Sequence, residues 1–117
     1  MFGWGRVIER EKFLEKVASN PQLLDTLMEL FAQQSDDTVQ TMIVALDIAD
    51  WQSLQRAVHD LKNIGRSVAS TKLIEHSRVL DEMANERQLE LLKKSVGRTS
   101  KLLAKAGKEL KALRKKL

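Results

Sequence analysis

The chain has 117 residues, a formal net charge of +4 and no cysteine. This length suits one domain and excludes two of ordinary size, and the lack of cysteine excludes a disulfide framework and a thiolate metal site. Hydrophobic residues make up 43% and charged residues 31% of the chain, with a single proline, which favours a folded helical protein over a disordered or strand-rich one.

The first 20 residues predict a short helix and no targeting segment. Residues 1–6 lack the basic start and apolar run of a signal peptide, and no stretch of the chain is apolar for long enough to span a membrane. We therefore expect a cytoplasmic protein without membrane insertion. The apolar residues that follow recur as on one face of a short amphipathic helix ending at Ser19-Asn20: Val7, Ile8, Phe13, Leu14 and Val17.

Asn20 and Pro21 predict the start of a second, long helix. Asparagine is a favoured N-cap, and proline suits the first helical turn because its missing N–H has no partner there. Apolar residues then follow helical spacing to about residue 46: Leu24, Leu27, Met28, Phe31, Met42, Ile43 and Leu46.

Two further helices are predicted between residues 50 and 85. Asp50 is a reasonable N-cap for the first, whose buried seam has spacings of three and four: Trp51, Leu54, Val58, Leu61, Gly65 and Val68. Ser70 or Thr71 can cap the second, which ends around Asn85. Its inward-facing residues are Leu73, Ser77, Leu80 and Ala84.

Residues 86–117 predict a long basic helix. An apolar stripe runs along it, at Leu89, Leu92, Val96, Thr99, Leu103, Ala106, Leu110, Leu113 and Leu117. Residues 93–117 also hold ten Lys or Arg and one Glu, which could bind nucleic acid or an acidic partner or could form a solvated face, the interpretation that we favour. Residues 103–117 could instead pair with a second copy as a coiled coil, but any bundle helix shows such a stripe, so a monomer is favoured over a homodimer.

Together these elements predict an all-α fold in one domain over residues 1–117. Short connections force consecutive helices to run antiparallel, which gives an up-down antiparallel four-helix bundle with a short extra N-terminal helix. The N-terminal helix lies in residues 1–20, the first three bundle helices and the motif-bearing part lie in residues 21–85, and residues 86–117 supply the last helix, which is long and basic.

His59 is the candidate reactive residue. It comes one position after Val58 of the buried seam, so it points to the flank of the bundle. Cations on its stripe would stabilise the charge of an attached or incoming phosphoryl group, although an ordinary exposed histidine has the same spacing. The neighbours one or two turns away are Gln55, Arg56, Lys62, Asn63 and Arg66.

The second histidine, His76, is expected to pack at the edge of the core. No carboxylate or second histidine falls at ligand-like spacing on its helix face except the adjacent Glu75, so we expect no metal site.

Residues 57–73 resemble the signature of histidine-containing phosphotransfer (HPt) domains. In that signature an alanine precedes the histidine, Leu-Lys-Gly follows it, and a leucine comes fourteen residues later, where this chain has Leu73. The pair Asp50-Trp51 ahead of the histidine and Ser77 and Leu80 after it also fit the family. This chain departs from the pattern at Asn63 and Ala69, where the family usually has glycine.

The resemblance implies a phosphorelay intermediate with His59 as phosphoacceptor and Lys62 steadying the phosphoryl group, with Gln55, Arg56, Asn63 and Arg66 as auxiliary residues. The partners would be response-regulator receiver domains or a hybrid sensor histidine kinase. Such a protein is a carrier, not an enzyme, and needs no cofactor of its own because the receiver supplies Mg²⁺. We expect Ile64 and Val68 to be exposed beside His59 and to help to hold the partner.

A helical binding module is the alternative function. In that case His59 is incidental, and the protein docks a receiver without accepting phosphate or uses its basic last helix to bind an acidic partner or nucleic acid.

Overall fold

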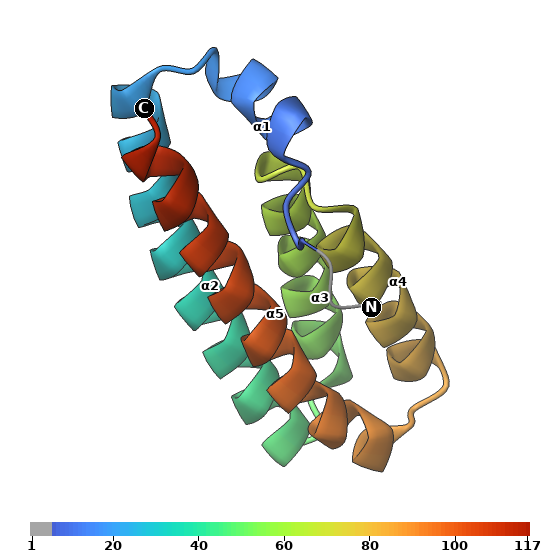
Figure 1. Cartoon of the computed structure of the whole chain (residues 1–117). Coiled ribbons are helices and arrows are strands. Elements are labelled where there is room, and N and C mark those ends of the chain that lie inside the picture. The colour runs from blue at the N-terminus through green and yellow to red at the C-terminus, as the bar shows by residue number, and fades with distance from the viewer. Residues whose placement is uncertain (1–5) are drawn as a thin grey trace.

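The computed structural model describes residues 6–117, which form five helices and no strand (Figure 1). This confirms the predicted all-helical class. The helices are α1 (Arg10–Val17), α2 (Pro21–Asp47), α3 (Trp51–Ser67), α4 (Thr71–Asn85) and α5 (Leu89–Lys115). The first five residues of the predicted N-terminal segment lie outside the described part of the chain.

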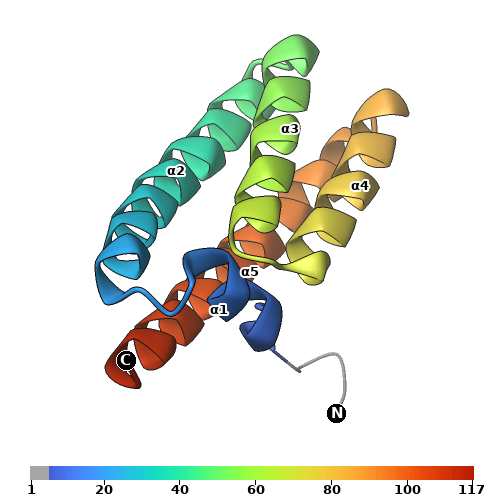
Figure 2. The same ribbon diagram turned by 90° about the horizontal axis from the view of Figure 1, so that it is seen from above.

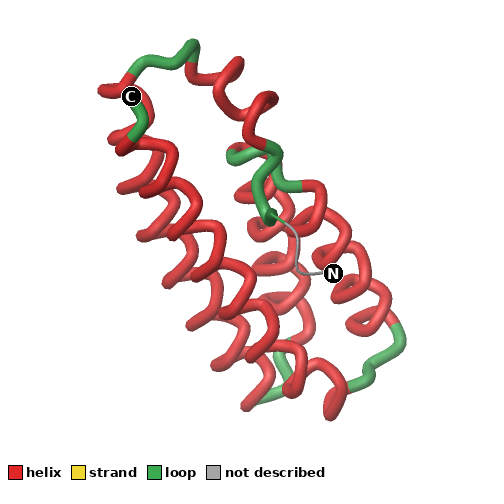
Figure 3. The backbone as a smooth tube through the Cα atoms, viewed as in Figure 1, coloured by secondary structure: helices red, strands yellow, loops and turns green. Residues whose placement is uncertain are grey.

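The four longer helices pack in a ring. Helix α2 packs against α3 and α5, and α4 packs against the same two helices. Successive helices run in opposite directions (Figure 1), and only short loops join them (Figure 3). Helix α1 crosses the end of the bundle where α2 and α4 begin (Figures 1 and 2).

Capping side chains fix where three of these helices begin. Asn20 Oδ1 accepts the amides of Gln22 and Leu23 at 3.0 and 3.2 Å, which caps α2 ahead of Pro21. Asp50 Oδ1 accepts the Ser53 amide at 3.1 Å and caps α3. Ser70, not Thr71, caps α4 by accepting the Leu73 amide at 3.1 Å. Each cap satisfies an N–H that the first turn would otherwise leave without a partner.

The core confirms most of the predicted inward-facing residues. All four from α4 are buried, as are six of the nine on α5: Leu92, Thr99, Leu103, Ala106, Leu110 and Leu113. Two predicted positions are wrong, because Ile43 and Leu117 are each 42% exposed. Burying the apolar faces of the four long helices in one cluster is the main contribution to the stability of the fold.

The N-terminal segment is held to the bundle by the carboxylate of Glu109 on α5. Its Oε2 and Oε1 accept the backbone amides of Val7 and Ile8, both at 2.9 Å. The predicted helix begins later than its apolar pattern indicated, since Val7 and Ile8 precede α1 in an irregular segment. Both side chains are nevertheless buried, so this segment closes the end of the core.

The alternative that residues 103–117 extend beyond the bundle and pair as a coiled coil, which the sequence analysis disfavoured, does not agree with the structure. Leu103, Leu110 and Leu113 are buried in the bundle core, and Arg114 Nε lies 2.6 Å from Asp25 Oδ1 of α2. The apolar stripe is therefore used inside one chain. In the described residues, no helix is both long and apolar enough to cross a membrane.

Candidate functional site

His59 lies on the exposed side of α3, near the middle of the helix. Val58 and Leu61 point into the core, and the helical rotation between neighbouring positions turns His59 outward. Within residues 6–117 its imidazole makes no hydrogen bond or ion pair. Both ring nitrogens are therefore accessible to a reacting group from solution.

Lys62 lies one turn after His59 and is half-buried, whereas Arg56, Asn63 and Arg66 are exposed. The side chains of Lys62 and Asn63 also make no hydrogen bond or ion pair with the described residues. A lysine and two arginines therefore lie within two turns of the imidazole on the outward side of α3, so this side of the helix is suited to contact a phosphoryl group.

Two predicted auxiliary residues contact the rest of the protein. Gln55 Nε2 donates to Asn85 Oδ1 on α4 at 3.1 Å, which ties the α3 face to its neighbour. After Ser53, Arg56 contributes to the lowered pKa of Asp50, the N-cap of α3. The Ser53 hydroxyl and amide hold the pKa of Asp50 below its usual value, with a smaller contribution from the Arg56 guanidinium.

Packing at both ends holds α3 in place. At its start, the Arg87 guanidinium lies over the Trp51 ring, 4.8 Å from the centroid. Toward its end, a Cβ added to Gly65 would lie 3.0 Å from Leu73 Cβ and 3.1 Å from the backbone nitrogen of Ile74. The absence of a side chain at Gly65 thus lets α4 approach α3 closely. Leu73, the leucine of the signature, packs against α3 at this point.

The prediction that Ile64 and Val68 are exposed is wrong. They are 3% and 1% exposed, respectively, and belong to the core. The reason is that α3 packs against both α2 and α4, so it buries an arc wider than a single seam. Because both side chains are buried, they are not available to contact a partner. The burial of Val68 does agree with its place on the predicted buried seam of this helix.

The loop after α3 contains Ala69, one of the two departures from the signature. Ala69 has φ of 53°, in the left-handed region where glycine carries no Cβ penalty. Alanine therefore occupies a backbone conformation that favours the glycine usual in the family.

His76 packs at the edge of the core, as predicted. Its Nε2 lies 2.7 Å from Thr99 Oγ1, and the Thr99 hydroxyl donates to the Ser95 carbonyl at 2.9 Å. Since that hydroxyl has one hydrogen, His76 must donate from Nε2 and Thr99 must accept. Burial, followed by the charge of Arg98, lowers the pKa of His76 to about 4. No group of three or more potential metal ligands occurs within the described residues.

The comparisons with known proteins agree with the signature. The family model described as Hpt domain matches residues 26–115, which include all of α3, α4 and α5 and most of α2. No curated protein and no solved structure matches the chain.

Proposed function

The chain belongs to the Hpt domain family, and on that basis we propose that it is a histidine phosphotransfer protein of a two-component phosphorelay. Hpt domains are carriers of phosphoryl groups and not enzymes in their own right. We further propose that the ring of four helices is the up-down antiparallel bundle of the family and that the protein works in the cytoplasm.

The observation that carries this proposal is the environment of His59. Its imidazole is exposed and without a partner among residues 6–117, and Lys62 lies one turn away with its ammonium also unpaired. Both residues fall inside the matched segment. In contrast, His76 is half-buried and its Nε2 is occupied by Thr99. His59 is therefore the histidine suited to accept a phosphoryl group.

The proposed reaction is a direct transfer between carriers. A nitrogen of His59 attacks the phosphorus of a phosphoaspartate on a receiver domain, the P–N bond forms, and the P–O bond to the aspartate breaks to release its carboxylate. Transfer to a second receiver reverses these bond changes. Lys62 balances charge on the phosphoryl oxygens, with Arg56 and Arg66 as more distant cations and Gln55 and Asn63 as polar contacts. Mg²⁺ is supplied by the receiver.

The docking surface is proposed to include α2. The groove residues Asp36 and Gln40 lie on the flank of α2 that faces α5. By helical rotation, Leu30, Val44 and Ile48 lie on the flank turned away from α5, beside α3, and they are 45%, 56% and 67% exposed. Exposed apolar residues next to a reactive face are typical of a docking site. They replace Ile64 and Val68 in the predicted role.

The primary test is phosphorylation by a receiver domain. Incubation with a phosphorylated receiver is expected to give an acid-labile, base-stable label on the wild-type protein and none on His59→Gln. The matched control is His76→Gln, which should be labelled like wild type because that ring packs against Thr99. Label that persists on His59→Gln would contradict the assignment of the acceptor.

The docking surface is tested separately. Val44→Asp is expected to slow transfer, because a charge replaces an apolar contact, while leaving the site on His59 intact. Leu91→Asp is the matched control, since Leu91 is 47% exposed but lies on α5. Equal rates for both variants would show that α2 is not part of the docking surface.

A binding module without phosphate transfer remains the second candidate, favoured by Asn63 in the place of the usual glycine. A side chain at this position narrows the approach of a partner to His59. If several phosphorylated receivers bind without labelling His59, the protein docks or sequesters its partner.

A further inference from the structure

Helices α2 and α5 lie side by side and carry opposite charge (Figure 1). Helix α2 contains five Asp or Glu and no Lys or Arg, whereas α5 contains nine Lys or Arg and two Glu. The side of the bundle formed by these two helices, called here the α2/α5 face, is therefore acidic along one half and basic along the other. The sequence shows both charge runs, but only the fold places them next to each other.

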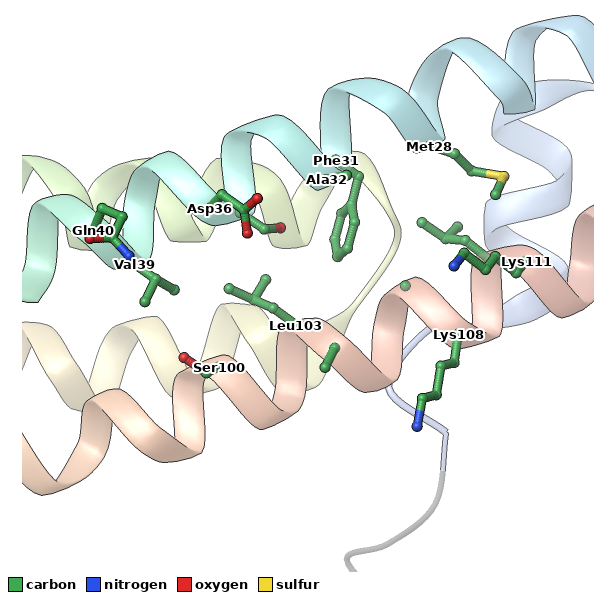
Figure 4. Close-up of a pocket in the computed structure, with 14 residues that line it drawn as sticks. Met28, Phe31, Ala32, Asp36, Val39, Gln40, Ser100, Leu103, Lys108 and Lys111 are labelled. Carbon is green, nitrogen blue, oxygen red and sulfur yellow. The ribbon is translucent and has the colours of Figure 1, made fainter.

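An open groove of about 440 Å³ runs between the two helices on this face. Phe31 and Val39 of α2 and Leu103 of α5 project into it from either side (Figure 4). Small residues at Ala104 and Gly107 leave it unfilled. The groove therefore exposes apolar surface between an acidic and a basic wall.

Several charged side chains on the two walls have no partner among residues 6–117. Asp25 and Arg114 form an ion pair across one end of the face, with Nε and Oδ1 2.6 Å apart. The side chains of Glu29, Asp36, Lys101 and Lys108 make no hydrogen bond or ion pair with residues 6–117. These charges are available to a binding partner.

We propose that two copies of this protein associate through their α2/α5 faces, related by a two-fold axis that lies in the plane of the interface and runs parallel to the two helices. Such an interface is isologous, so the surface must be complementary to itself. A face of one charge would repel its copy. Here the rotation places the acidic α2 of each copy against the basic α5 of the other, and both charge contacts are attractive.

Ile43 is the expected apolar anchor of this interface. It is 42% exposed and lies one turn after Val39, on the stripe of α2 that lines the groove. The two-fold rotation places this end of α2 over the same end of the copy's α5. Burying an isoleucine there contributes free energy beyond that of the rim charges.

The size of the face is adequate for a stable dimer. Two adjacent helices of 27 residues each present roughly 40 Å by 20 Å, or about 800 Å² per copy, which is typical of specific interfaces. His59 on α3 stays outside the interface, so each copy keeps its site. From the sequence alone a monomer is favoured, because a bundle core by itself accounts for the apolar stripe of α5, whereas the interface proposed here depends on the opposite charges of the two helices.

Charge reversal with a mixing step tests the pairing. Wild type is expected to sediment as a dimer at low ionic strength and to dissociate as salt is added. Glu29→Lys/Asp36→Lys makes both walls locally basic, and Lys101→Glu/Lys108→Glu makes both locally acidic, so each variant alone should dimerise about tenfold or more weakly. An equimolar mixture should form a one-to-one heterodimer, because opposite charges face each other again.

The matched control for charge is Glu11→Lys/Glu15→Lys, which has the same net charge as the first variant but changes exposed residues of α1. It should dimerise like wild type. The proposal is overturned if wild type is monomeric at low salt throughout the submillimolar range, or if the mixture does not associate while both variants show native helical circular dichroism.

An uncharged variant gives an independent result that does not depend on the folding of the charge-reversed proteins. Ile43→Ala should weaken the dimer, whereas Leu30→Ala, 45% exposed on the other flank of α2, should not. Equal effects of the two changes would also overturn the proposal. Phosphoryl transfer to His59 should be unaffected by Ile43→Ala, which separates this result from any failure of the proposed relay function.

Discussion

Lys62 is half-buried one turn after His59, and its ammonium has no partner among residues 6–117. A charge held in place near the acceptor stabilises the phosphoryl oxygens most when the transfer is under way. We expect Lys62→Met to slow transfer by about tenfold to a hundredfold, less than complete loss because the receiver's Mg²⁺ carries much of the charge. Rapid-quench transfer rates would measure this. Lys94→Met on α5 is the control, and an equal loss there would refute a local role for Lys62.

His76 makes the free energy of unfolding depend on pH. Its pKa is about 4 in the folded protein, against 6.5 for an unperturbed histidine, because it is desolvated and faces Arg98. The unfolded chain therefore binds a proton at higher pH than the folded one, and stability falls as pH decreases from about 6.5 toward 4. After discounting for the partial exposure of the ring, we expect a loss of about 1–2 kcal/mol.

Urea unfolding of wild type and His76→Gln across this range checks the prediction. The glutamine amide can still donate to Thr99 but does not titrate, so this part of the pH dependence should disappear. If both proteins lose stability in parallel, another group is responsible. The sequence predicted that His76 packs at the core edge but not that it faces Thr99 of a different helix.

At the scale of whole helices, the sequence predicted most boundaries because they depend on local chemistry. Asn20, Asp50 and Ser70 cap the helices for which they were proposed, and each cap acts within three residues of itself. The burial of Ile64 could not be predicted in the same way. It depends on how far two neighbouring helices cover α3, and this is a property of packing and not of spacing along one helix.

Gly65 sets the distance between α3 and α4. We expect Gly65→Ala to lower the free energy of unfolding by about 1–3 kcal/mol, because the new methyl would press on Leu73 and on the backbone of Ile74 and force the helices apart. This outweighs the gain in helix propensity of about 1 kcal/mol for alanine. Chemical denaturation measures the change. Gly97→Ala is the control, since nothing lies near its added Cβ, and it should be neutral or stabilising.

At the scale of the whole molecule, Glu109 joins the N-terminal segment to the last helix. Glu109→Ala leaves the amides of Val7 and Ile8 without their acceptor, at a cost of about 1–3 kcal/mol for each donor that stays buried. We expect faster hydrogen exchange throughout α1, measured by mass spectrometry. Glu90→Ala on the same helix should have no such effect. Unchanged exchange in Glu109→Ala would show that the buried apolar residues alone hold α1.

The role of Glu109 had no signal in the sequence, because Val7 and Ile8 lie 102 and 101 positions before it. The same holds for the α2/α5 face, whose two charge runs come from distant parts of the chain. Candidate site residues that share one helix, such as His59 and Lys62, were predicted as a group because helical spacing is local. Sites that need two helices were not.

The contact between α2 and α5 also has a consequence for how the chain folds. The other neighbours in the ring are consecutive helices joined by short turns, so they can form as hairpins with little loss of loop entropy. Only α2 and α5, the first and last of the four long helices, are neighbours in the ring but far apart along the chain. We therefore expect this seam, which also contains the open groove, to be the last part of the ring to close during folding and the first to separate when the protein unfolds.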